Sequence, residues 1–238
     1  MKNFKLKISN FNKYLIFCIG ILFIYLFYLS IPTIYNKDTL QKELSKKIFS
    51  NYNLNLSLSS DIDYLILPSP HFLIKNAKIF NNKSTTPEEL GQIKKLKVFI
   101  SKKSLMKQKH MRITKILIKD ANFSIRNDNL NFYYIYINNK LSDNKIEIKN
   151  SNFFFKDKAD ETISILFIPN SNLFFDKEKK INKLSGKGEM FQIPINFKWK
   201  RRFDGNSTKN FLFNIESLNL YFENKSSISE KNIDQGEN

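Results

Sequence analysis

The sequence predicts a mainly β protein held by a single N-terminal transmembrane helix, with a short amphipathic helix ahead of a curved antiparallel β-sheet that forms a groove. Three observations lead to this fold class. An uncharged run of 23 residues lies between Lys13 and Lys37, apolar and polar residues alternate through most of the remaining chain, and one short phrase recurs within that alternation. The 238 residues suffice for one domain with appendages.

The uncharged run, residues 14–36, predicts a transmembrane segment. As a helix it would extend about 34 Å, against a hydrocarbon core of about 30 Å. Tyr14 and Tyr35 stand at its two ends, where aromatic side chains prefer the membrane interface. A cleaved signal peptide is the alternative, but "LSIPTIYNKD" offers no small-residue cleavage site, so an uncleaved signal anchor is favoured.

Charge does not decide the orientation of this anchor, because four lysines precede it and four follow closely. A large domain behind a single anchor usually crosses the membrane. We therefore expect residues 1–13 in the cytoplasm, a single pass through the inner membrane, and the bulk of the chain in the periplasm.

The net charge of +17 arises from 39 Lys and Arg against 22 Asp and Glu. Only four of the cations are Arg, the residue best suited to phosphate and base recognition, so no nucleic-acid partner is expected. The excess of Lys fits AT-rich codon usage and a solvated surface. Cys18 lies alone within the apolar run, so no disulfide and no thiol-based zinc site is expected.

Beyond the anchor, two helical stretches precede or interrupt the strands. Leu40, Leu44 and Ile48 form one stripe of an amphipathic helix within "KDTLQKELSKKIFSNY", with Asp38 as its expected cap. Residues 101–109 predict one or two helical turns. Alternating residues predict strands over 54–58 and 62–66, which Pro68 and Pro70 end. The β-domain is expected over 37–223, followed by a disordered polar tail over 224–238.

The recurring phrase is found at residues 74–77, 118–121 and 148–151, as Ile-Lys-Asn-Ala, Ile-Lys-Asp-Ala and Ile-Lys-Asn-Ser. In the second and third copies the apolar positions change parity after the Asn or Asp. A strand that changes parity keeps its apolar side on one face only if it bends or bulges there. The phrase therefore predicts a bend in a long strand; separate hairpins are the alternative.

A looser copy occurs at 167–175. The spacings between the copies, 44, 30 and 20 residues, are too uneven for a solenoid and fit antiparallel strands joined by loops of different length.

The order of these elements resembles the AsmA family of bacterial envelope proteins. The matching segments are "IPTIYNKDTLQKELSKKI", "LSLSSDIDYLILPSPHFLIKNAKIFNN" and "LKVFISKKSLMKQKHMRITKILIKDANFSIRNDNLNF", and "LSGKGEMFQIPINFKWK" is similar to a later strand pair of that family. The resemblance covers about residues 14–200. AsmA proteins are usually much longer, and the turn before Asn131 lacks the glycine common there.

The resemblance implies a membrane-anchored periplasmic protein with an open β-groove that takes part in lipid movement or outer-membrane homeostasis, with membrane phospholipid as its partner. Exposing a 16-carbon acyl chain to water costs about 12 kcal/mol, which an apolar groove would largely remove. The residues expected to line it are Ile116, Ile118, Phe123, Ile125, Ile146, Ile148, Phe153 and Phe155. The alternative is that these residues form an ordinary filled core.

Enzymatic chemistry finds no support, so we expect no catalytic residues, no metal site and no cofactor. His71 and His110 lack a second ligand at suitable spacing and are expected at the surface or in turns. Gly186-Lys187-Gly188 precedes a strand pattern and so does not fit a phosphate loop.

Two further readings remain beside the lipid groove. One is a lipopolysaccharide-export component with one anchor and a jelly-roll domain, which would bind a periplasmic partner by strand addition. The other is a periplasmic scaffold without a ligand.

Overall fold

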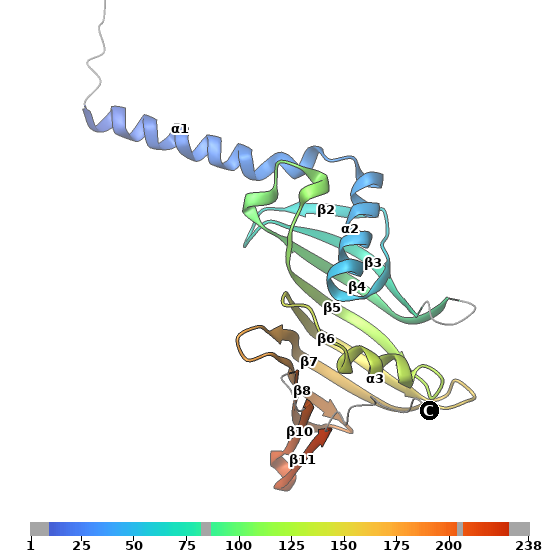
Figure 1. The fold of residues 1–238 in the computed structure, drawn as a ribbon. Coiled ribbons are helices and arrows are strands. Elements are labelled where there is room, and N and C mark those ends of the chain that lie inside the picture. Colours follow the sequence, from blue (N-terminus) through green and yellow to red (C-terminus); the bar gives the residue numbers. More distant parts are fainter. Residues whose placement is uncertain (1–9, 82–86, 204–206, 229–238) are drawn as a thin grey trace, which may run out of the picture.

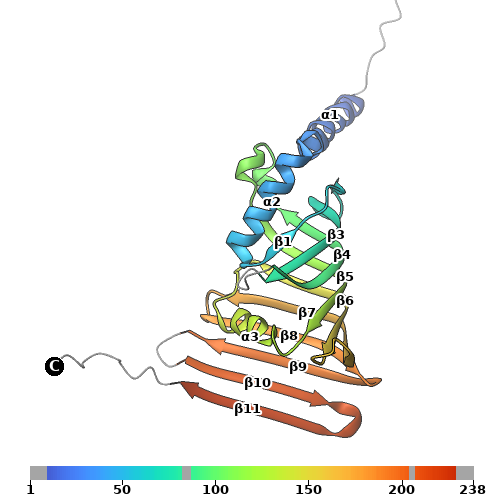
Figure 2. The ribbon, with the colours of Figure 1, turned by 90° about the vertical axis from the view of Figure 1, so that its right-hand side faces the viewer.

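The computed structural model describes residues 10–81, 87–203 and 207–228. A long helix projects from a stack of strands that cross the long axis of the molecule (Figures 1 and 2). The strands form one curved, open sheet in the order β1-β3-β4-β5-β6-β7-β8-β9-β10-β11, with β2 paired to β3. Their bounds are β1 Asn55–Ser57, β2 Ile62–Leu65, β3 His71–Asn81, β4 Glu88–Ile100, β5 Ile113–Ile125, β6 Lys145–Lys156, β7 Thr162–Asp176, β8 Ile181–Met190, β9 Ile193–Arg202, β10 Ser207–Ile215 and β11 Leu220–Ile228.

Helix α1, Asn10–Ser30, continues into a short 3₁₀ turn, η1, over Ile31–Ile34. Pro32 in this turn cannot donate a backbone hydrogen bond, which accounts for the end of the α-helix. Within the described residues, Asn12–Ile34 is the one helical stretch long and apolar enough to cross a membrane. This agrees with the span expected over 14–36, and α1 fits a membrane anchor.

Helix α2, Lys37–Tyr52, buries the expected stripe of Leu40, Leu44 and Ile48 against the sheet. The expectation for its cap was wrong. Asn36, not Asp38, is the N-cap, and its side chain accepts a hydrogen bond from the Thr39 amide at 3.0 Å. The connection between β4 and β5 contains two single 3₁₀ turns, η2 (Lys102–Ser104) and η3 (Gln108–His110), as expected for this segment.

The recurring phrase produces a bend in each of its three strands. Asn76, Asp120 and Asn150 have φ angles of 55°, 55° and 48°, in the left-handed region that Asn and Asp tolerate better than most residues. On β3 and β4, Lys75 pairs with Lys95 and Ala77 with Ile93, so each strand leaves one residue out of the ladder. The two strands therefore bend at the same place. The bends therefore form a line across the sheet without shifting its register there.

The looser copy in β7 bends differently. Lys149 pairs with Asn170 and Ser151 with Ile168, so Pro169 is the β7 residue omitted opposite Asn150. Asn170 is not among the residues with positive φ. The parity of the buried positions still changes, from Ile168 to Ser171.

One strand pair is parallel. β5 and β6 align Ile116 with Ile146, Ile118 with Ile148 and Phe123 with Phe153, so the two best copies of the phrase lie side by side in register. Parallel strands need a crossover connection, and here it contains helix α3, Leu130–Asn138. This helix was not expected, because its residues, "LNFYYIYIN", have strong strand propensity.

Both α2 and α3 cover the same face of the sheet, hereafter the inner face (Figure 1). Under α2 this face is a filled core that includes Phe72, Ile74, Leu96 and Val98, all fully buried. The surface expectation for His71 was wrong. It is fully buried at the start of β3, its ring stacked on Phe99 with centroids 4.9 Å apart, whereas His110 is exposed.

At the far end of the stack, β11 runs to Ile228 and so includes residues 224–228 of the segment expected to be a polar tail. Residues 229–238 of that tail, and residues 1–9 of the expected cytoplasmic segment, lie outside the described part of the chain. β8 and β9 form the antiparallel pair expected for "LSGKGEMFQIPINFKWK", and Gly186 and Gly188 lie within β8 rather than in a phosphate loop.

Candidate functional site

The inner face is hollow between α3 and the sheet, over strands β3 to β9. This hollow, hereafter the trough, has a volume of about 240 Å³ and almost entirely apolar walls. By comparison, an apolar cavity of about 150 Å³ binds benzene. Its lining consists of Leu54, Ile79, Leu90, Ile118, Phe123, Ile125, Phe132, Tyr133, Tyr136, Ile137, Ile146, Ile148, Phe153, Phe155, Leu166, Ile168, Ser171, Leu173, Leu184 and Phe197.

Seven of the eight residues expected to line a groove lie on this trough, namely Ile118, Phe123, Ile125, Ile146, Ile148, Phe153 and Phe155. Ile116 does not line the trough. It is fully buried in the continuous hydrophobic core. Helix α2 covers the part of this core that lies nearer the anchor. The sequence could not separate the two positions because Ile116 and Ile118 belong to the same alternating pattern.

Two aromatic rings from neighbouring strands contribute to the floor. Phe123 on β5 and Phe153 on β6 are stacked, with centroids 4.5 Å apart and planes inclined by 17°. This contact follows from the in-register parallel pairing of the two strands. Phe153 and Phe155 are only partly buried, so both leave apolar surface facing the trough.

The roof of the trough is α3, whose contribution the strand-based interpretation missed. Phe132 and Tyr136, and likewise Tyr133 and Ile137, are four residues apart and therefore project from one side of the helix. All four line the trough. This i, i+4 spacing is the sequence signal that could have identified the helix.

The N-terminal end of α3 is bound to β4 and β5. The Tyr133 hydroxyl lies within hydrogen-bond distance of two carbonyl oxygens, 3.2 Å from that of Leu90 and 3.1 Å from that of Ser124. The Asn129 side chain donates to Glu88 at 2.9 Å. Burial raises the pKa of the Tyr133 and Tyr136 phenols above their ordinary value, which is consistent with neutral hydroxyls enclosed beneath the helix.

The C-terminal end of α3 is bound to β8 by a buried amide. Asn182 Nδ2 donates to the carbonyl oxygens of Ile137 and Asn139 at 3.2 and 2.6 Å, and its Oδ1 accepts from the Leu141 amide at 2.9 Å. Arg201 on β9 also donates to the Asn138 carbonyl. With both ends attached, α3 forms a strap across the inner face.

Beyond the strap, a second apolar hollow of about 390 Å³ lies over β7 to β10. It shares Leu166 and Phe197 with the trough, so apolar surface continues from beneath α3 toward the last strands. Its remaining lining is Met190, Phe191, Ile193, Ile195, Phe211, Phe213 and Ile215.

Gly186 permits the close approach that shapes this surface. A Cβ at Gly186 would lie 2.6 Å from Ser171 Cβ and 2.7 Å from Phe197 Cζ, closer than side chains can pack.

No charged side chain among the described residues lines the trough. The outer face, by contrast, carries paired charges and amides. At the bend, Asn150 donates to Asp120, and Lys95 lies 3.4 Å from the same carboxylate. These contacts lower the pKa of Asp120, the Asn150 hydrogen bond most strongly. Over residues 10–81, 87–203 and 207–228, no three His, Cys, Asp or Glu side chains are grouped so that they could hold a metal ion. The trough is therefore suited to an uncharged hydrocarbon group.

The model of the AsmA family matches residues 8–173, which include α1, α2, the α3 strap and the part of the trough floor up to Leu173 in β7. A search of curated proteins found no match.

Proposed function

Because the chain belongs to the AsmA family of envelope proteins, we propose that it is a membrane-anchored periplasmic protein that holds phospholipid acyl chains in its trough and guides them along the inner face of the sheet. In this role it would act in outer-membrane biogenesis or homeostasis by binding rather than by catalysis. The inner membrane would hold α1, and the β-domain would extend away from it.

The observation that carries the proposal is the continuity of apolar surface on the inner face. The trough and the second hollow together extend from β3 to β10, with Leu166 and Phe197 in common. A hydrocarbon chain transferred from water to such a surface gains about 0.8 kcal/mol for each buried methylene. The charged headgroup would stay outside, since the lining offers it no charged partner.

The test is photo-crosslinking from two adjacent positions of β6. Phe153 lines the trough, and Phe154 points to the other face, beside Gln92 and Asn122. A photoreactive phenylalanine analogue is placed at either position in the full chain, cells are irradiated, and attached lipid is identified by mass spectrometry. We expect phospholipid at position 153 and little at 154. Lipopolysaccharide at 153 would favour the export-component reading, and no lipid at either position would favour the scaffold.

A protein partner is proposed for the far end of the sheet. Among the described strands β11 pairs only with β10, so its other edge is open to an added strand. Such a partner would extend the sheet, and with it the apolar surface.

A further inference from the structure

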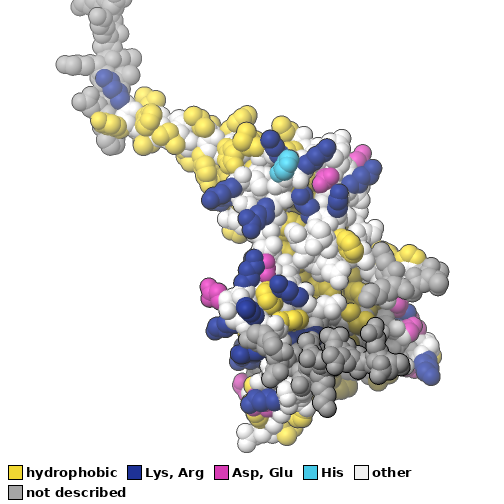
Figure 3. Space-filling view, viewed as in Figure 1, with side chains coloured by type: hydrophobic (Ala, Val, Ile, Leu, Met, Phe, Trp, Pro, Cys, Tyr) yellow, Lys and Arg dark blue, Asp and Glu magenta, His cyan; other side chains and the backbone are white. Residues whose placement is uncertain are grey.

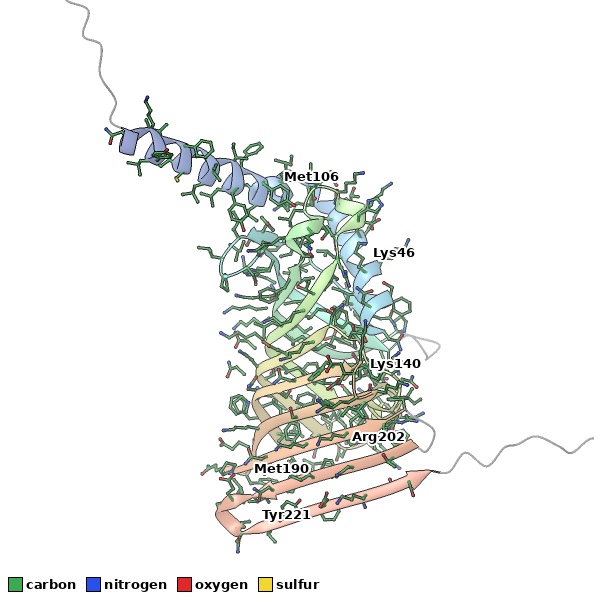
Figure 4. The ribbon with its side chains drawn as sticks, turned by 60° about the vertical axis from the view of Figure 1, so that its left-hand side comes forward. Lys46, Met106, Lys140, Met190, Arg202 and Tyr221 are labelled. Atoms are coloured by element: carbon green, nitrogen blue, oxygen red, sulfur yellow. The ribbon has the colours of Figure 1, made fainter. Side chains whose placement is uncertain are left out.

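The connection between β4 and β5, residues 101–112, lies where α1 meets the β-domain. Figure 4 labels Met106 at this junction, and Figure 3 shows Lys and Arg side chains gathered around it. We name residues 101–112 the basic loop. It contains no acidic residue and five cationic ones, which are Lys102, Lys103, Lys107, Lys109 and Arg112.

The basic loop is fixed to the end of the anchor. The Tyr28 hydroxyl donates to the Lys102 carbonyl at 2.6 Å, and Lys102 Nζ lies 3.2 Å from the Tyr25 hydroxyl, to which it donates. The Tyr35 hydroxyl donates to the carbonyl of Leu105, a residue that is itself fully buried. These contacts hold the loop in a defined position relative to α1.

That position corresponds to the depth of lipid headgroups. Tyr35 stands at the end of the apolar run 14–36, and its hydroxyl holds the Leu105 carbonyl next to Met106. A headgroup layer is about 5–8 Å thick on each side of the hydrocarbon core. Tyr side chains favour this layer. The part of the basic loop around Met106 therefore lies level with the headgroups at the end of the apolar run.

The charges of the basic loop differ from those of the sheet. Across the described residues, Lys103, Lys107, Lys109 and Arg112 form no ion pair. Some lysines of the strands are paired, as in Lys78 with Glu89 at 2.7 Å and Lys183 with Asp176 at 2.6 Å, and others, such as Lys187 and Lys198, form no ion pair with any described residue. The basic loop differs from the strands in that five cations lie within twelve residues that include no acidic side chain.

An exposed apolar side chain accompanies these charges. Met106 is 69% exposed and lies in the sequence between Lys103 and Lys107. Ile34, which ends the 3₁₀ turn after the anchor, is 82% exposed. Cationic groups flanking exposed apolar groups are typical of segments that rest in the interface of an anionic membrane.

We propose that the basic loop is a binding surface for the anionic phospholipid headgroups of the leaflet from which α1 emerges, with Met106 inserted at the acyl boundary. The four unpaired cations contact lipid phosphates, and the tyrosine contacts transmit this attachment to α1. The loop thereby fixes the tilt of the β-domain on the membrane. This surface is separate from the trough and does not depend on what the trough holds.

The test uses the full chain in nanodiscs of pure phosphatidylcholine or of phosphatidylcholine mixed with phosphatidylglycerol. With Cys18→Ser removing the native thiol, Met106→Cys carries an environment-sensitive fluorophore. We expect blue-shifted, brighter emission in the phosphatidylglycerol discs only. The shift should be lost in about 1 M salt, where the Debye length is about 3 Å. Tyr221→Cys, at an exposed position of β11 at the far end of the sheet, should report water in every disc.

Matched charge variants separate this surface from general basicity. The triple change Lys103→Gln, Lys107→Gln and Lys109→Gln should abolish the shift at position 106. The control variant loses the same charge at exposed positions of β8 and β9, through Lys187→Gln, Lys198→Gln and Lys200→Gln. This variant should keep the emission shift at position 106. Equal emission in the two kinds of disc, or equal loss in the two triple variants, would overturn the proposal. If a triple variant fails to fold, the salt titration of the labelled chain with its lysines unchanged tests the same electrostatic attachment.

Discussion

Asn182 on β8 donates a hydrogen bond of 2.6 Å to the carbonyl oxygen of Asn139, the residue that ends α3. The same amide also bonds Ile137 and Leu141, and it is fully buried. The Asn182 side chain thus satisfies three backbone groups at the C-terminal end of α3 and in the connection that follows it. The strap and the sheet are therefore expected to unfold together.

Asn182→Ala should lower the free energy of unfolding by about 2–3 kcal/mol, because buried backbone groups are left without partners. Urea unfolding of the full chain in detergent, followed by the fluorescence of the sole tryptophan, Trp199, measures the change. Asn170→Ala removes an exposed amide from the neighbouring strand and should change stability by less than about 0.5 kcal/mol. Equal stability of both variants would show that Asn182 does not hold the strap.

The bend at Asn76 gives a second prediction, which concerns the backbone alone, since Asn76 is exposed and has a φ of 55°. Asn76→Val should cost at least about 1–2 kcal/mol, because a β-branched residue is strained in the left-handed region. Asn76→Gly should be tolerated. Thermal unfolding compares the three chains, and a valine variant as stable as the glycine variant would contradict the bend as the cause.

The third prediction concerns the passage between the two hollows. Leu166 lines both, and its neighbour Ile165 is 44% exposed and lines neither. Leu166→Glu places a carboxylate in apolar surroundings and should reduce co-purifying phospholipid tenfold or more, since each 1.4 kcal/mol of lost binding is about a factor of ten. Ile165→Glu should retain the lipid. Quantitative lipid mass spectrometry decides, and equal lipid in the two variants would argue against a path through Leu166.

His71 predicts a dependence of stability on pH. Burial, with Lys97 and Lys115 nearby, lowers the pKa of this imidazole below its ordinary value, although the Ser69 carbonyl 2.8 Å from Nδ1 opposes the shift. In the unfolded chain His71 takes up a proton near pH 6.5, while in the folded protein it stays neutral to lower pH. Its contribution is therefore complete above pH 6.5 and is lost as the pH falls below that value.

Between about pH 7.5 and 5.5, the unfolding free energy should fall by up to about 1.4 kcal/mol for each pH unit below 6.5. Urea titrations at several pH values measure this slope. His71→Phe keeps a ring against Phe99 and should flatten it, whereas His110→Gln, at an exposed position, should not. A slope unchanged by His71→Phe would assign the effect to other groups.

The sequence pattern was sufficient to predict the long apolar helix α1, α2 and the bends, and seven of the eight residues that it nominated lie on the trough. These features depend on local periodicity, and Asn76, Asp120 and Asn150 bend the chain wherever the strand pattern changes parity. Two features needed the tertiary structure. The crossover between the parallel strands β5 and β6 and the roof formed by residues 130–138 appear only in the fold, since the strand propensity of these residues masks their i, i+4 spacing, and the burial of Ile116 depends on a core assembled from distant parts of the chain.

The line of bends has a consequence for how such a protein can grow. In β3, β5 and β6 the bend is encoded by the strand's own copy of the phrase. Adjacent strands omit matching residues, so their pairing register is the same on both sides of the bend. A hairpin with the same phrase could be inserted at this line without altering the curvature of its neighbours. The distance that the β-domain extends from the membrane would then change by about 4.8 Å for each added strand, and the rest of the fold would stay the same.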